Sequence, residues 1–166
     1  MWLVAKYKKT DLNFFKSNIL DKVDKDVEFY NPKIKYQKII RKKLYTFEQN
    51  ILGNYILCYH PSFKNKNFVN FLKSVKGLEY FLPSYESSQR GIIEFINYSK
   101  NFENKEGFLT QEFFDTSKLK KIKFLTGPFA GQICKIISEK KKILNILVGN
   151  ITTSISKKRN LLYLPA

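Results

Sequence analysis

The spacing of the apolar residues changes along this chain of 166 residues, and that change limits the folds open to it. Up to about residue 102, short apolar runs typical of strands alternate with segments whose apolar residues recur every three or four positions, as in helices. From residue 121 onward the runs are short and separated by turn residues. The sequence therefore predicts an α+β region followed by a small all-β region.

The first region reads as strand, helix, three strands, helix, strand and helix. Alternation of this kind predicts a ferredoxin-like α/β sandwich. Thr10 or Asp11 can cap the first helix, with Phe14, Phe15, Ile19 and Val23 expected on one face. The expected strands are 2–7, 26–32, 54–59 and 78–82, with a basic hairpin over 33–51 and helices over about 10–23, 67–75 and 88–102.

The second region predicts five short strands that close a small β-barrel. They are expected at 121–125, 132–138, 143–150, 152–157 and 160–164. Residues 132–148 also fit an amphipathic helix, because Ile133, Ile136, Ile137, Leu144 and Leu147 fall at helical spacings. Periodicity alone does not decide between the two for such short runs.

The net charge of +16 is unevenly distributed. Residues 119–166 contain 10 Lys and Arg but one acidic residue, Glu139, so the boundary is expected near a linker at 104–118. A basic protein of this size is attracted to nucleic acid, the ribosome or a membrane surface. Part of the lysine content matches the Lys, Asn, Ile, Phe and Tyr usage that an AT-rich genome favours.

The residue types that enzymes and metal sites need are sparse. Cys58 and Cys134 lie in apolar runs and are expected to be buried thiols, and with the single His60 they fall short of a zinc site. No spacing suggests a nucleophile with its base, or a phosphate-binding loop. No apolar run approaches the ~20 residues of a membrane span. We expect a monomeric, cytoplasmic protein without catalytic activity, cofactor or membrane association.

Four segments, in this order, resemble the NusG family of transcription elongation factors. They are "WLVA" (2–5), "ILGNYILC" (51–58), "LKSVKGLEYFL" (72–82) and "GPFAG" (127–131). The last is similar to the turn of the KOW motif, here Gly127, Pro128, Phe129, Gly131 and Cys134. The tail and Asn54 resemble the specialised RfaH-like branch, whereas Gly53 and Cys134 depart from the family's usual proline and glycine.

The resemblance implies an N-terminal domain over 1–103 and a KOW-type β-barrel over 119–166. The first would bind the clamp helices of the largest RNA polymerase subunit through Ile51, Leu52 and Tyr55, promoting processivity and antitermination. Upstream or non-template DNA would be contacted by basic residues. These are Lys6, Lys8, Lys9 and, at the hairpin tip, Arg41, Lys42 and Lys43. The barrel would recruit a small-subunit ribosomal protein, a termination factor or RNA.

Two alternatives stay open at this point. The basic tail also fits a general RNA- or ribosome-binding KOW protein without a polymerase role. In the RfaH-like branch, moreover, the tail can fold as a helical hairpin before it becomes a barrel, which the mixed periodicity of 132–148 allows.

Overall fold

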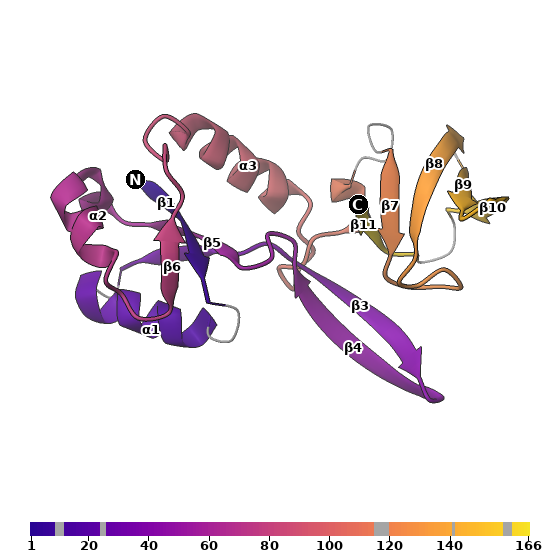
Figure 1. Cartoon of the computed structure of the whole chain (residues 1–166), viewed down its shortest axis with the longest axis horizontal. Coiled ribbons are helices and arrows are strands. Elements are labelled where there is room, and N and C mark those ends of the chain that lie inside the picture. The colour runs from indigo at the N-terminus through magenta and orange to yellow at the C-terminus, as the bar shows by residue number, and fades with distance from the viewer. Residues whose placement is uncertain (9–11, 24–25, 115–119, 141, 158–160) are drawn as a thin grey trace. The chain divides into compact units, whose positions relative to one another are not determined.

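The computed structural model describes residues 1–8, 12–23, 26–114, 120–140, 142–157 and 161–166. The chain divides into two compact units. The first comprises Met1–Lys33 and Gln49–Gly107, and the second comprises Ile34–Glu48 and Phe108–Ala166. Three α-helices and eleven strands lie within these described ranges (Figure 1). The protein is thus a mixed α/β protein, as the alternation of apolar spacings predicts.

A four-stranded antiparallel sheet organises the first unit. Its strands run in the order β2 (Glu28–Tyr30), β5 (Tyr55–Tyr59), β1 (Trp2–Tyr7) and β6 (Leu78–Phe81). The central strand β1 pairs with β5 on one side and with β6 on the other. All four strands lie within the ranges expected from the sequence, or within one residue of them.

Helices cover both faces of this sheet. Leu3, Ala5 and Tyr7 of β1 share a core with the helices α1 (Leu12–Val23) and α2 (Lys66–Leu72). Trp2 and Leu57 share a second core with Ile96 of α3 (Gln89–Asn101). Because successive strand residues point to opposite faces, one strand supplies both cores. Trp2 is packed in the interior, since it is 8% exposed.

The buried stripe of α1 is narrower than expected. Phe15 and Ile19 are fully buried, but Phe14 is 43% exposed, so its expected place on the buried face is wrong. Neighbouring helical residues point about 100° apart, and a stripe built on positions i and i+4 therefore excludes Phe14. A short 3₁₀ helix, η1 (Pro61–Lys64), precedes α2, and His60 caps it by accepting a hydrogen bond from the Ser62 amide.

The hairpin expected over 33–51 is present. It consists of β3 (Lys33–Ile40) and β4 (Lys43–Asn50), which pair only with each other among the described strands. Figure 1 shows them as a long two-stranded ribbon. Arg41 and Lys42 form the turn between them.

A five-stranded antiparallel sheet organises the second unit, in the order β10-β9-β8-β7-β11. Its strands are β7 (Lys121–Phe124), β8 (Ile133–Lys140), β9 (Ile143–Val148), β10 (Ile151–Ser156) and β11 (Tyr163–Pro165). A 3₁₀ helix, η2 (Gln111–Phe113), precedes it. Ile122, Phe124, Cys134, Leu144 and Ile146 form the core of this unit.

The helical alternative for 132–148 is wrong in this structure, because these residues form β8 and β9. Burial alternates with period two at Leu144 and Ile146, which are nearly inaccessible, and each lies across from a residue of β8. Strand pairing provides hydrogen-bond partners for the backbone N–H and C=O groups of this segment. Strands also suit its isoleucines, because β-branched side chains lose rotamer freedom in a helix. In the described part of the chain no helix is long and apolar enough to cross a membrane.

Candidate functional site

Three side chains form a row across the sheet of the first unit. Lys6 of β1 lies opposite Tyr55 of β5 and opposite Tyr80 of β6. The two tyrosine hydroxyls are hydrogen-bonded at 3.0 Å, and the Lys6 ammonium lies 5.2 Å from the centre of the Tyr80 ring. We call Lys6, Tyr55 and Tyr80 the tyrosine row. Tyr80 is 40% exposed, so the row presents aromatic surface to solvent.

Hydrogen bonds tune the ionisation of this row. Lys6 Nζ lies 3.0 Å from Glu79 Oε2, and this bond is the main reason that the pKa of Lys6 is raised. The bond with Tyr80 is the main reason that the pKa of Tyr55 is raised. The lysine therefore stays cationic and the Tyr55 phenol stays neutral near pH 7. Such a surface suits a protein partner, because tyrosine contributes apolar area while its hydroxyl keeps a polar contact.

The turn 51–54 places Leu52 beside the row. The Tyr55 amide donates to the Leu52 carbonyl at 3.2 Å, and the Tyr7 hydroxyl donates to the Gly53 carbonyl at 3.2 Å. Gly53 has φ of +61°, a conformation that glycine adopts readily. Leu52 packs partly against the α3-side core, and Ile51 is half-buried. Ile51, Leu52 and Tyr55 thus lie together, with part of each side chain accessible.

The basic candidates lie in different settings. Lys6 is engaged with Glu79, whereas Lys8 is exposed and its amide donates to the Gly77 carbonyl at 2.9 Å. Lys9 lies outside the described residues. Arg41, Lys42 and Lys43 are all exposed at the end of the hairpin. Their side chains can reach a polyanion without first breaking a contact that buries them.

The glycine turn in the second unit connects β7 to β8. Gly127 and Gly131 have φ of +81° and +88°, and the Gly131 amide donates to the Phe124 carbonyl at 2.7 Å. A β-carbon on Gly127 would lie 2.3 Å from Leu161 Cδ2. Phe129 packs against the core, with its ring centre 6.0 Å from that of Phe124. Phe129 therefore covers part of the core of the second unit beneath the turn. Pro128 is exposed at the turn and Cys134 is fully buried.

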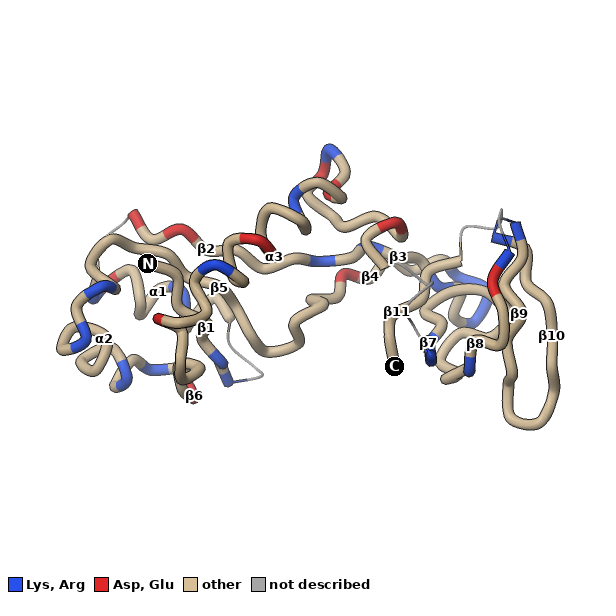
Figure 2. The backbone as a smooth tube through the Cα atoms, turned by 90° about the horizontal axis from the view of Figure 1, so that it is seen from above, with Lys and Arg blue, Asp and Glu red and all other residues tan. Residues whose placement is uncertain are grey.

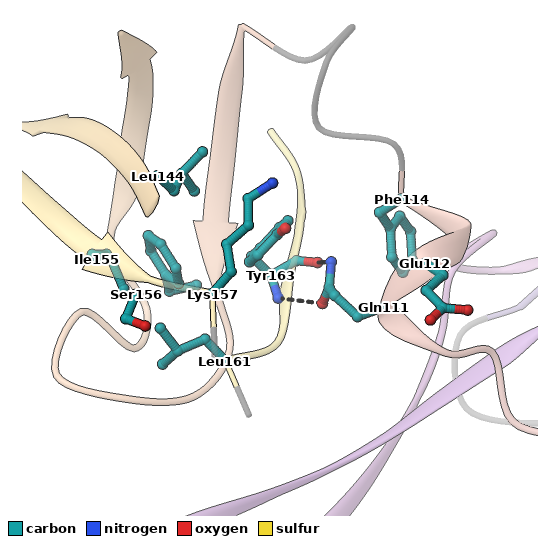
Figure 3. Close-up of a pocket in the computed structure, with 10 residues that line it drawn as sticks. Gln111, Glu112, Phe114, Leu144, Ile155, Ser156, Lys157, Leu161 and Tyr163 are labelled. Carbon is teal, nitrogen blue, oxygen red and sulfur yellow. Dashed lines mark hydrogen bonds between the residues drawn. The ribbon is translucent and has the colours of Figure 1, made fainter. Parts of the chain in front are cut away.

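The second unit also contains a cavity of about 340 Å³. The segment that carries Gln111 forms one side of it (Figure 3). The Tyr163 amide donates to Gln111 Oε1 at 3.1 Å, and Gln111 Nε2 donates to the Tyr163 carbonyl at 3.5 Å. The walls are mainly apolar, with Lys157, ion-paired to Glu139, at the rim. The lining includes Phe114, Phe124, Leu144, Ile155 and Leu161. A cavity of this kind can accept an apolar side chain.

Sequence reasoning missed Tyr80 and the exposed apolar residues of the hairpin. Tyr80 joins the site only through the strand register, which apolar spacing does not give. The hairpin did carry a signal, because "II" and "LY" flank "RKK". Two consecutive apolar residues in a strand point to opposite faces, so both faces of the ribbon had to be apolar there.

Among known proteins, the chain is similar only at the level of solved structures. No protein-family model matches the sequence, and no curated protein matches it. The chain is similar to a crystal structure of the MjSpt4:Spt5 complex in conformation B, with 12% identity and a TM-score of 0.29, over 100% of this chain and 98% of that chain. It is also similar to a structure of Thermotoga maritima NusG, with 16% identity and a TM-score of 0.34, over 93% of this chain and 91% of that one. Values this low assign neither a family nor a function.

Proposed function

We propose that the chain is a NusG-like transcription elongation factor that binds RNA polymerase and acts without chemistry of its own. The observation that carries the proposal is the position of the four family-like segments. "WLVA" lies in the central strand β1, "ILGNYILC" spans the turn and strand β5, "LKSVKGLEYFL" runs from α2 into β6, and "GPFAG" joins β7 to β8. These are the places that the resemblance requires.

Strand order supports the domain assignment. When the hairpin strands β3 and β4 are left out, β1, β2, β5 and β6 are the first to fourth strands of the domain. Their order in the sheet, β2-β5-β1-β6, is then 2-3-1-4, which is the order of a ferredoxin-like sandwich. The second sheet is a run of neighbouring antiparallel strands with β11 beside β7, as a KOW-type barrel requires. We keep the bounds that the resemblance implies, which are 1–103 for the N-terminal domain, 104–118 for a linker and 119–166 for the KOW domain. The compact units divide the chain differently, because the hairpin residues 34–48 and residues 108–114 fall in the second unit.

Within this proposal, the tyrosine row and the turn 51–54 form the polymerase-binding surface. Leu52 and Tyr55 contribute apolar contact area, Ile51 flanks them, and the Tyr55–Tyr80 bond fixes the orientation of one ring. Anchors of this kind, rigid and aromatic, dominate the energy of protein interfaces. The clamp helices of the largest polymerase subunit are the proposed partner, with processivity and antitermination as the outcome. We place the chain in the specialised RfaH-like branch for two reasons. Asn54 resembles that branch, and Cys134 stands where the family usually has glycine.

The direct test is copurification with core RNA polymerase together with a pausing assay in vitro. The proposal predicts that the full chain comigrates with core polymerase and shortens pauses. A chain that neither comigrates nor alters pausing would refute it. The nonenzymatic role predicts that the chain by itself converts neither the nucleotides nor the nucleic acid of the assay. Conversion of either in the absence of polymerase would contradict that role.

A second function, general RNA or ribosome binding, is favoured by one observation. Exposed lysines follow the strands of the second unit, at positions 121, 123, 135, 140 and 142 (Figure 2). A basic surface of this kind could bind a ribosomal protein, a termination factor or RNA. Under this alternative, binding to ribosomes would survive Leu52→Asp and Tyr55→Asp, and polymerase would not copurify.

A further inference from the structure

The sheet of the second unit has one long, uncharged edge. Its edge strands are β10 (Ile151–Ser156) and β11 (Tyr163–Pro165). β11 has three residues and ends in Pro165, and both short strands and prolines protect sheet edges from pairing with other chains. β10 has six residues, none of them charged and none a proline. It pairs with β9 without a register shift, so no bulge interrupts its edge.

The other edges that the structure describes are protected. In the first sheet, β2 has three residues including the exposed Glu28, and β6 has four including the exposed Glu79. The ribbon of β3 and β4 carries charged residues on both strands. A charge at an edge opposes pairing with another strand, because pairing would take the charge out of water. Among the described strands, β10 therefore offers the edge most open to a further strand.

The edge lies in a stretch of the chain without charge. Residues 143–156, which form β9, the turn and β10, contain no charged side chain, although 27% of the whole chain is charged. Nucleic acids are held mainly through phosphate contacts with Lys and Arg, which this stretch lacks. Ile151 of β10 is 71% exposed, so the edge also presents apolar surface. A neutral, partly apolar strand fits this edge, and a second copy of the chain presents one.

The turn between β9 and β10 fixes which backbone groups face outward. It has two residues, so Val148 and Ile151 form a hydrogen-bonded pair across it. Hydrogen-bonded and non-hydrogen-bonded pairs alternate along an antiparallel ladder. The N–H and C=O groups of Thr152 and Ser154 therefore point away from β9 and toward the open edge.

Two copies of β10 match each other in an antiparallel register centred on Thr153. Thr152 then lies opposite Ser154 of the second copy, and their outward backbone groups exchange hydrogen bonds. Ile151 lies opposite Ile155 of the second copy, on the face that covers the core to which Ile155 belongs. Because each Ile151 leaves solvent for an apolar neighbour, this register buries the most exposed side chain of the edge.

A row of hydrogen-bonded polar side chains crosses the other face of the sheet and ends at β10. Asn145 Nδ2 donates to the Ser138 hydroxyl at 2.7 Å, and the Ser154 hydroxyl donates to Asn145 Oδ1 at 2.6 Å. In the register centred on Thr153, Thr152 of the second copy lies beside Ser154, whose oxygen can also accept a hydrogen bond. Cross-strand Thr–Ser pairs stabilise antiparallel sheets. The row therefore continues from one copy to the next.

We propose that the chain forms a dimer through β10, which joins two five-stranded sheets into one. A twofold axis passes between the two Thr153 residues, so the assembly closes at two copies. The interface is small, and we expect a dissociation constant on the order of 0.1 mM. The inference does not rest on polymerase binding, because the turn 51–54 and the tyrosine row contribute no residue to β10. Its failure and the failure of polymerase binding are therefore separable.

Sedimentation equilibrium of the full chain measures the association. We expect the average mass to rise from 19.6 kDa toward twice that value as the concentration passes about 0.1 mM. Added salt should strengthen the association, because salt screens the repulsion between two chains of net charge +16. Association bridged by a nucleic acid would weaken with salt instead, and that result would overturn the proposal.

One charge at the edge should disrupt the pairing. Ile151→Lys places an ammonium opposite Ile155 of the second copy, and we expect roughly tenfold weaker association or less association still. Ile151 is largely exposed, so the variant should remain folded, which circular dichroism checks. Ile137→Lys is the matched control, because it adds the same charge at an isoleucine that is 51% exposed on β8, inside the sheet. It should associate like the wild type.

Cysteine cross-linking tests the register. In a non-hydrogen-bonded pair the two Cα atoms are about 4.5 Å apart, which is within the range of a disulfide. Thr153→Cys should therefore form a disulfide between two copies under mild oxidation. Thr152→Cys is the control and should cross-link more slowly, because position 152 lies opposite 154. The native Cys58 and Cys134 are buried and should contribute little.

The proposal is overturned by any of the following results. A wild type that stays monomeric at every concentration would leave the edge to a strand of another protein. Equal association of the wild type and Ile151→Lys, or equal loss in Ile151→Lys and Ile137→Lys, would place the contact elsewhere. A mass that rises beyond two copies would exclude a closed dimer, and equal cross-linking at positions 152 and 153 would exclude the register.

Discussion

At the scale of single residues, two tight turns differ in the type of residue that adopts positive φ. In the β7–β8 turn, position 127 is a glycine, the backbone has φ of +81°, and a β-carbon would collide with Leu161. Arg41 has a long charged side chain at φ of +49°, although nothing in the geometry of the turn favours it. The first residue serves the fold and the second is kept at a cost to the fold, which is typical of a functional position.

Gly127→Ala should lower the free energy of unfolding of the second unit. The alanine would have a strained backbone, at about 1–2 kcal/mol, and would push Leu161 out of its packed position, at about 1 kcal/mol more. Gly149→Ala is the control, because Gly149 has φ of +59° but no atom within 4 Å of its β-carbon position. Urea unfolding of both variants measures the difference. Equal destabilisation would show that the contact with Leu161 is unimportant.

Arg41→Asn/Lys42→Gly should raise the stability of the hairpin by about 1–2 kcal/mol, since Asn-Gly adopts the turn without strain. Amide hydrogen exchange along β3 and β4 reports this directly. Slower exchange is the expected result. Faster exchange would mean that the arginine and lysine stabilise the turn through contacts of their own.

At the scale of elements, Gln111 ties η2 to the edge strand β11. One amide side chain bonds both the N–H and the C=O of Tyr163, as a neighbouring strand would. Phe114, which follows η2, is buried. The segment therefore closes one side of the cavity.

Gln111→Ala should release this segment and cost about 1–2 kcal/mol, since two backbone groups lose their partners. Glu112→Ala, in the same 3₁₀ turn, is the control and should be nearly neutral. Hydrogen exchange at the Tyr163 amide is the measurement, with faster exchange expected in the first variant alone. An unchanged rate would indicate that the packing of Phe114 holds the segment without the amide.

The order of elements was predictable from apolar spacing because strands and helices of ordinary length differ in period. The apolar spacing of 132–148 fits both a helix and a pair of strands, so this segment alone does not determine its structure. Pairing with β7 and β10, which lie outside it, favours strands. The tyrosine row shows the same limit. Tyr55 was expected from the resemblance, but Tyr80 and Glu79 reach the site through strand pairing between residues far apart in sequence.

At the scale of the whole molecule, each unit has its own core and one buried thiol. Cys58 lies in the first core and Cys134 in the second. Burial raises the pKa of both thiols, so the reactive thiolate is scarce in the folded state. Each cysteine can therefore report on the opening of one unit.

We expect both thiols to react slowly with iodoacetamide, and to respond to different guanidinium concentrations because their cores are separate. Peptide mass spectrometry distinguishes the two sites. Ser87→Cys, at an exposed position, is the control and should react at once. Identical profiles for Cys58 and Cys134 at every concentration would mean that the two units unfold as one.

We propose that the turn 51–54 and the tyrosine row bind RNA polymerase. Titration of labelled full chain with core polymerase tests it most directly. Tyr55→Asp should weaken binding at least tenfold, because a buried charge replaces an aromatic anchor. Tyr98→Asp, at a tyrosine of α3 that is 44% exposed, should leave binding unchanged. Equal affinities for the wild type, Tyr55→Asp and Tyr98→Asp, with all three folded by circular dichroism, would contradict the account.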